Sequence, residues 1–243
     1  MAVGSTQQAN GKIAAAFEAI GGEFGCAPRE LAARASRCRA LLFDWDGVFN
    51  TGSKGNGQAS RFGEPDSMGT NMLRYGLWRM HGSMPFAAII SGASNENARE
   101  FAEREHFSEV YLGVKDKRSV VDHLCERDGL RPEEIACIWD DINDLSVAAV
   151  CGLRFQVRRD AGPLFTDYVA RHALRDYLTA STGGAHAVRE VSELVLGLTG
   201  QFDAVVASRA ASDADYAAYF EARQQVRTCL YAEVGGRIVS RTG

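Results

Sequence analysis

Short apolar runs alternate with amphipathic segments between residues 40 and 157, and this alternation limits the folds that are open to the chain. The runs read ALLFD, FAAIIS, EVYLGV, IACIWD and LRFQV, and each has the length of a buried strand. The segments between them, such as SMGTNMLRYGLWRM, place apolar side chains on one helical face. Strands and helices that alternate in this way form a parallel sheet with helices on both faces, so we expect a three-layer α/β fold.

Charged and polar residues follow four of these runs at the point where each run ends. The ends read FDWDG, IISG, GVKDK and WDDIND. Because ligands of open parallel sheets bind at the carboxyl ends of the strands, we expect these residues to line one site. The residues at that edge are Asp44, Asp46, Ser91, Lys117, Asp140, Asp141 and Asp144.

The residue types at this edge are those of a metal-assisted reaction on a phosphate. Asp44 and Asp46 lie two positions apart and can face one site, where their mutual repulsion favours a divalent cation such as Mg²⁺. Lys117 offers a positive charge to a phosphate group. Ser91 and the backbone N–H groups around Gly92 offer neutral donors. The set predicts phosphoryl transfer through an aspartyl phosphate, in which Asp44 attacks and Asp46 moves the proton.

The motif order D-x-D-G, apolar-S-G, lysine and D-D-x-x-D resembles the haloacid dehalogenase (HAD) superfamily, whose members are mostly Mg²⁺-dependent phosphohydrolases. The resemblance covers residues 40 to about 200 and implies a Rossmann-like fold. It gives the roles of nucleophile, general acid and base, phosphate donor and stabilising cation to Asp44, Asp46, Ser91 and Lys117, in that order. It also implies that Asp140, the carboxylate of Asp44 and the main-chain carbonyl of Asp46 hold the metal. Asp141 and Asp144 would orient the site.

The spacing of these motifs leaves no room for a cap domain. Gly47 and Ser91 are separated only by a candidate β-hairpin flap at residues 48–62 and a helix. The segments DWDGVFNTG, DSMG, VKDK, DDINDLSVAAVCGL and GGAHAVRE resemble the capless branch whose best-known member is 3-deoxy-D-manno-octulosonate 8-phosphate phosphatase. That branch acts on phosphates of keto-deoxy sugar acids and forms homotetramers, in which the flap and C-terminal segment of one subunit border a neighbour's site. The resemblance makes these residues candidates for the substrate surface: Gly92, Asp66, Ser67, Arg189 and Glu190.

Departures from the branch leave the exact substrate open. Trp139 stands where the branch has glycine, and it is either a packing residue or a substrate platform. Lys115 competes with Lys117 for the role of the cation, and the pair Arg158 and Arg159 either attracts an anionic substrate or forms a solvated surface. The alternative function is a catalytically weak or inactive HAD scaffold that acts as a regulatory or assembly module. Phosphotransfer to an acceptor other than water is a third hypothesis, and the lack of a cap to exclude water argues against it.

The composition limits the partners. A formal net charge of −4 over 243 residues argues against nucleic acid or an anionic membrane, which need clustered positive charge. No segment reaches the roughly 18 apolar residues of a membrane span. Six scattered cysteines without a C-x-x-C pair indicate reduced thiols. We therefore expect a cytoplasmic homo-oligomer with a small phosphomonoester as substrate.

We expect three parts along the chain. They are a helical N-terminal extension at 1–37, a HAD catalytic domain at 38–200, and a C-terminal helical segment with a tail at 201–243. The first ten residues are small and polar and predict an irregular tail. DYVA at residues 167–170 is expected as a short strand, and Ser212 with Asp215 as the start of a helix. Residues 229–243 form either a hairpin around Gly235 and Gly236 or no regular structure.

Overall fold

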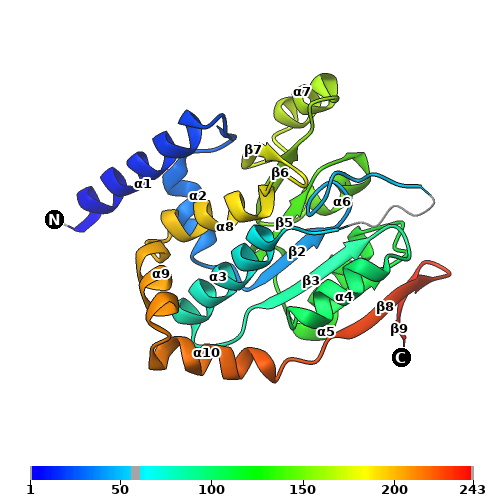
Figure 1. Cartoon of the computed structure of the whole chain (residues 1–243). Helices are drawn as coiled ribbons and strands as arrows, with labels where there is room; N and C mark the ends of the chain where they lie inside the picture. Colours follow the sequence, from blue (N-terminus) through cyan, green and yellow to red (C-terminus); the bar gives the residue numbers. More distant parts are fainter. Residues whose placement is uncertain (1, 56–60, 242–243) are drawn as a thin grey trace.

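The computed structural model describes residues 2–55 and 61–241, and its centre is a nine-stranded sheet (Figure 1). The strand order is β1-β7-β6-β5-β2-β3-β4-β8-β9, and the seven strands from β7 to β8 in this order run parallel. The two outermost strands, β1 and β9, pair antiparallel with their neighbours. The strands are β1 Glu23–Phe24, β2 Ala40–Asp44, β3 Phe86–Ser91, β4 Glu109–Leu112, β5 Ile135–Trp139, β6 Leu153–Arg158, β7 Tyr177–Thr182, β8 Cys229–Val234 and β9 Arg237–Arg241.

Helices cover both faces of the sheet, which confirms the expected three layers. One core lies under α2, α3, α4 and α8, and a second lies under α5, α6 and α7 on the other face. The strand β2 is buried because Leu41 and Phe43 enter the first core while Ala40 and Leu42 enter the second. The helices are α1 Ala2–Ala19, α2 Pro28–Ala35, α3 Glu64–His81, α4 Glu96–Arg104, α5 Arg118–Asp128, α6 Leu145–Ala148, α7 Pro163–Arg171, α8 Ala187–Leu198, α9 Phe202–Ala211 and α10 Ala214–Gln224. Short 3₁₀ turns lie at Pro132–Glu134 and Ile142–Asp144.

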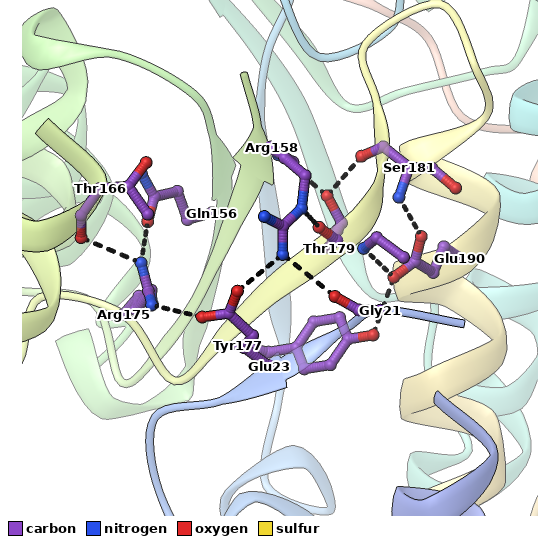
Figure 2. A network of polar contacts seen from close by, with 11 residues as sticks. Gly21, Glu23, Gln156, Arg158, Thr166, Arg175, Tyr177, Thr179, Ser181 and Glu190 are labelled. Carbon is purple, nitrogen blue, oxygen red and sulfur yellow. Dashed lines mark hydrogen bonds and ion pairs between the residues drawn. The ribbon is translucent and has the colours of Figure 1, made fainter. Parts of the chain in front are cut away.

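Both terminal segments add strands to the central sheet. Figure 1 shows the β8–β9 hairpin at the edge of the sheet opposite the N-terminal segment, so the hairpin expected around Gly235 and Gly236 is confirmed. At the other edge, the Glu23 carboxylate of β1 accepts hydrogen bonds from Arg158 at 2.8 Å and from Arg175 at 3.0 Å (Figure 2). The division of the chain into three parts after residues 37 and 200 stays a prediction. Strands from both the first and the last of these parts are hydrogen-bonded to the sheet.

Three local expectations are wrong. Residues 167–170 lie inside α7, which Pro163 opens, and the strand comes later, at β7. Asp213, not Ser212, caps α10, because its side chain accepts a hydrogen bond from the Tyr216 N–H at 3.0 Å, while Ser212 ends α9 with a φ of 47°. The small polar residues at the N-terminus belong to α1, which begins at Ala2.

The segment expected as a β-hairpin flap is only partly described. Val48 and Phe49 are buried in the first core, and an isolated bridge joins Asp46 to Asn50. The described residues 51–55 and 61–63 form irregular loop. Because residues 56–60 lie outside the described residues, a hairpin in this segment stays a prediction. Among the described residues, no helix is long and apolar enough to cross a membrane.

A buried carboxylate joins the N-terminal extension to the sheet. Asp176, immediately before β7, is 1% exposed and accepts hydrogen bonds from Arg34 of α2 at 2.9 Å and from the Arg154 side chain at 2.7 and 3.1 Å. Burial raises the pKa of Asp176, but the two arginines outweigh it and hold the pKa below its ordinary value. The extension is therefore bound to the fold by a charge pair that requires an ionised carboxylate.

We predict that Asp176→Asn lowers the free energy of unfolding by about 3 kcal/mol, because both guanidinium groups lose their carboxylate. The exposed pair of Arg171 and Asp167 on α7 gives the control, and Asp167→Asn should cost less than about 0.5 kcal/mol. Because the pKa of Asp176 is lowered, its contribution is complete above about pH 4 and declines as the pH falls further. Urea unfolding measures both variants, and equal losses in the two would contradict the assignment.

Candidate active site

A cavity of about 370 Å³ lies at the carboxyl edge of the parallel strands. It collects eight residues that the sequence predicted for the site and six others, so these predicted residues do lie together, while their roles stay a prediction. Five carboxylates and four cationic side chains line it. The predicted residues in its wall are Asp44, Asp46, Ser91, Gly92, Lys117, Asp140, Asp141 and Asp144, and the others are Gly52, Lys54, Val114, Lys115, Asn143 and Arg159.

The two aspartates of the first motif reach the cavity because the aromatic residue between them points the other way. Asp44 is the last residue of β2 and lies opposite Ile90 of β3. Trp45 is fully buried in the first core and stacks on Phe49 with ring centroids 4.9 Å apart. This alternation leaves both carboxylates at the cavity, where Asp46 contacts Lys54 at 3.3 Å.

Lys117 connects two of the carboxylates. It lies at the N-terminus of α5, is 5% exposed, and donates a hydrogen bond to Asp44 Oδ1 at 2.6 Å and another to Asp144. Burial lowers the pKa of Lys117, but Asp44 and Asp144 outweigh it and the pKa lies above its ordinary value. Lys115 lines the cavity too, and its backbone N–H donates to Glu233 at 2.8 Å. Lys117 is therefore the lysine that holds the nucleophile candidate.

The residues at the cavity floor fit a divalent metal ion. Carboxylate oxygens of Asp44, Asp140 and Asp144 all lie within 4.8 Å of one another. Burial and the charge of Asp144 raise the pKa of Asp44 well above its ordinary value, while Lys117 opposes this. Hard, closely spaced oxygens of this kind suit Mg²⁺. Lys117 donates to both Asp44 and Asp144, and Arg159 donates to Asp140, so these contacts do not choose among the three acids, and the assignment of Asp44 and Asp140 as ligands stays a prediction.

The acids of the fourth motif shape their own turn. The Asp141 side chain accepts a hydrogen bond from the Ile142 N–H at 2.7 Å, and Asp144 accepts one from the Asp141 N–H at 3.3 Å. This mutual capping closes the 3₁₀ turn after β5. The arrangement holds Asp140 and Asp144 at the cavity, and the role of Asp141 in orienting the site stays a prediction.

Arg159 is a site residue that the sequence left undecided. Its Nε donates a hydrogen bond to Asp140 Oδ2, so its guanidinium stands beside a proposed metal ligand. The Arg158 side chain instead reaches Glu23 and the carbonyl oxygens of Gly21 and Thr179, away from the cavity (Figure 2). The register of β6 with β7 shifts between Gln156 and Arg158, and such irregularities re-aim side chains beside active sites.

Asp66 and Ser67, predicted for the substrate surface, do not line this cavity. Asp66 is fully buried; its Oδ1 accepts a hydrogen bond from the Arg189 N–H at 3.0 Å, and its Oδ2 lies 3.3 Å from His186 Nδ1. Asp66 therefore caps the N-terminus of α8. Ser67 donates to Glu105 at 2.8 Å. Contact of these residues with substrate stays a prediction.

Glu190 and the Arg189 side chain are also engaged elsewhere. The Glu190 carboxylate accepts hydrogen bonds from the Tyr177 hydroxyl at 2.8 Å and from the Ala180 and Ser181 N–H groups at 2.7 and 2.8 Å (Figure 2). The Arg189 side chain donates to Glu193 at 2.6 Å. Glu190 thus fixes the end of β7 that leads into the glycine-rich turn, and a substrate role for either residue stays a prediction.

Trp139 is a packing residue. It is 1% exposed, lies in the second core, and meets Phe165 edge to face with ring centroids 6.2 Å apart. Since it is absent from the wall of the main cavity, its ring does not narrow that space.

Two glycines allow the backbone to close around the site. A Cβ added at Gly47, whose φ is +93°, would lie 2.0 Å from Asp140 Oδ2 and 2.2 Å from an Arg159 nitrogen. A Cβ added at Gly183 would lie 2.1 Å from the Gly47 carbonyl oxygen and 2.5 Å from that of Asn50. The glycine-rich turn before α8 and the base of the flap segment therefore pack backbone against backbone beside the carboxylates.

Comparisons with known proteins agree with one another. The 3-deoxy-D-manno-octulosonate 8-phosphate phosphatase of Yersinia pestis is 31% identical over 173 residues, which are 71% of this chain and 87% of that protein. The enzyme of that name from Escherichia coli K12 is 29% identical over 184 residues, which are 74% of this chain and 90% of that protein. The crystal structure of the Moraxella catarrhalis enzyme, in complex with a magnesium ion, a phosphate ion and KDO, matches with a TM-score of 0.62 and 28% identity. That match covers 74% of this chain and 97% of that chain. No family model matches the chain.

We predict that Gly47→Ala weakens Mn²⁺ binding about tenfold or more, because the added methyl group displaces the Asp140 carboxylate. The matched control is Gly129→Ala at the end of α5, where φ is also positive, at +66°, and no atom would lie within 4 Å of the new Cβ. Both variants lose about 1 kcal/mol of stability from the positive φ. Calorimetric titration with Mn²⁺ and urea unfolding separate the two effects. Equal Mn²⁺ affinities in the two variants would refute the role of Gly47.

Proposed function

Because the chain belongs to the HAD superfamily, in the family of 3-deoxy-D-manno-octulosonate 8-phosphate phosphatases, we propose that it hydrolyses the phosphate monoester of a small keto-deoxy sugar acid with Mg²⁺ as cofactor. One observation carries the proposal: Asp44, Asp140 and Asp144 share the floor of a cavity with Lys117. Acids this close need a cation, and a divalent metal ion would supply positive charge for both the carboxylates and the phosphate of the substrate.

In the first half of the proposed reaction, a carboxylate oxygen of Asp44 attacks phosphorus and the bond from phosphorus to the sugar oxygen breaks. Lys117, 2.6 Å from Asp44, orients the nucleophile and offsets the negative charge that gathers on the phosphoryl oxygens. The Asp46 carboxyl gives its proton to the departing sugar oxygen. Ser91 and the backbone N–H of Gly92 line the cavity as neutral donors to the phosphoryl group.

In the second half, a water oxygen attacks the phosphorus of the aspartyl phosphate while Asp46 accepts a proton from that water. The bond between phosphorus and the Asp44 oxygen breaks, which releases inorganic phosphate and restores both carboxyl groups to their starting state. A Mg²⁺ ion held by Asp44, Asp140 and the main-chain carbonyl of Asp46 would supply charge neutralisation for the nucleophile and the phosphate.

The substrate class rests on the relatives. The Moraxella catarrhalis enzyme is described with KDO and phosphate together, which supports a sugar acid phosphate as the class of substrate for this chain. The cavity volume of about 370 Å³ is within the range of small-ligand sites. The homotetramer and the cytoplasmic location expected from the sequence remain proposals. In a tetramer, a neighbouring subunit would complete the substrate surface that one chain leaves open.

One observation that favoured the alternative of an inactive HAD scaffold no longer supports it. That observation was Trp139, which lies in the core and does not line the main cavity. The carboxylates and the lysine that hydrolysis needs are all at the site.

We predict that the protein hydrolyses an aryl phosphate only when Mg²⁺ is present, and that Asp44→Asn lowers kcat/KM at least about a thousandfold because the nucleophile is lost. Asp122→Asn on the exposed face of α5 is the control and should keep full activity. A panel of keto-deoxy sugar acid phosphates, hexose phosphates and nucleotides, assayed by phosphate release, tests the substrate class. Turnover that survives Asp44→Asn or needs no metal would contradict the mechanism.

A further inference from the structure

The cation beside the proposed metal ligand shares a carboxylate with the metal. Arg159 donates its Nε–H to Asp140 Oδ2, and Asp140 belongs to the acidic cluster with Asp44 and Asp144. A guanidinium is always charged, and it would lie against a divalent cation held by the same carboxylate. We therefore expect repulsion between the two cations to weaken the pair between Arg159 and Asp140 when the metal binds.

The structure offers the freed guanidinium a second place. A neighbouring cavity of about 220 Å³ lies between the base of the flap segment and the glycine-rich turn, and Arg159 lines both cavities. Its wall combines neutral polar groups of Asn50, Thr51, Thr182 and Gly183 with one carboxylate, Asp160, and two cations, Arg158 and Arg159. Arg159 is 39% exposed, so its side chain is not fixed by packing.

Three of the four other cations of the two cavities are less suited to bind a further anion. Arg158 lines the smaller cavity, but its guanidinium is held by Glu23 and two carbonyl oxygens (Figure 2). Lys117 already contacts Asp44 and Asp144. Lys54 is 66% exposed and contacts Asp46. The planar fork of an arginine also matches a carboxylate better than an ammonium group does.

We propose that Arg159 neutralises the Asp140 carboxylate in the absence of metal. Once a divalent cation displaces it, the Arg159 guanidinium binds the carboxylate of a sugar acid phosphate in the neighbouring cavity. The choice of carboxylate rests on the proposed function, whereas the competition with metal does not. The exchange makes metal and substrate binding favour each other, because the metal releases the residue that the substrate's carboxylate needs. Arg159 thereby selects substrates with a carboxylate over neutral sugar phosphates.

The first measurement is Mn²⁺ binding by calorimetry to the full chain without substrate. Arg159→Gln should bind Mn²⁺ about tenfold more tightly than the parent protein, because the competing charge is removed. Arg159→Lys, which keeps the charge, should stay closer to the parent. The exposed Arg171→Gln on α7 removes the same charge far from both cavities and should leave the affinity unchanged. No tightening in Arg159→Gln would overturn the competition with metal.

The second measurement compares two substrates at saturating Mg²⁺. For Arg159→Gln, kcat/KM on a keto-deoxy sugar acid phosphate should fall about tenfold or more relative to kcat/KM on an aryl phosphate without a carboxylate, mainly through KM. Equal losses on both substrates would overturn the specificity role. If the parent protein hydrolyses the aryl phosphate but no sugar acid phosphate, the carboxylate assignment falls together with the proposed substrate class. The Mn²⁺ titration tests the competition between Arg159 and the metal independently of substrate, even if the parent protein hydrolyses neither compound.

Discussion

Repulsion among buried carboxylates at the carboxyl edge of the sheet is the constraint on which the site depends. Asp44, Asp140 and Asp144 bring oxygens within 4.8 Å of one another, and burial strengthens the repulsion between their charges. The chain offsets it with two cations, since Lys117 holds Asp44 and Asp144 while Arg159 holds Asp140. Lys117 contacts the nucleophile candidate, whereas Arg159 contacts only Asp140 of the cluster. In our proposal the first cation is catalytic and the second gives way to the metal.

The rest of the fold keeps these groups in place from both ends of the chain. The glycine-rich turn before α8 packs against the backbone of the flap segment, with Gly183 directly against Gly47 and Asn50. Hydrogen bonds to Glu190 at the end of β7 and to Asp66 at the start of α8 fix the two sides of this glycine-rich turn. Glu190 and Asp66, which the motif resemblance makes candidates for substrate binding, thus support the loops that border the site. The terminal segments extend the same sheet, and none of their described residues lines the main cavity.

The sequence predicts the fold and the centre of the site because both depend on local patterns. Buried parallel strands are nearly continuous apolar runs, and the acids at their ends are visible in FDWDG and WDDIND. β7 escapes prediction because four of the six residues in YLTAST are small or polar, whereas DYVA is taken up by a helix that Pro163 starts. The directions of Arg158 and Arg159 depend on a register shift against β7, and the buried roles of Asp66 and Glu190 depend on contacts with distant backbone groups. No periodicity encodes such contacts.

The central claim is that Asp44 carries the phosphoryl group during turnover. Direct detection of that group tests it most sharply: the enzyme is mixed with Mg²⁺ and an aryl phosphate labelled on phosphorus, quenched in acid within the first turnover, digested and analysed by mass spectrometry. The account predicts label on the peptide that contains Asp44, with more label in Asp46→Asn because breakdown of the aspartyl phosphate needs that carboxyl group. Release of phosphate without label on this peptide, or label on another residue, would contradict it.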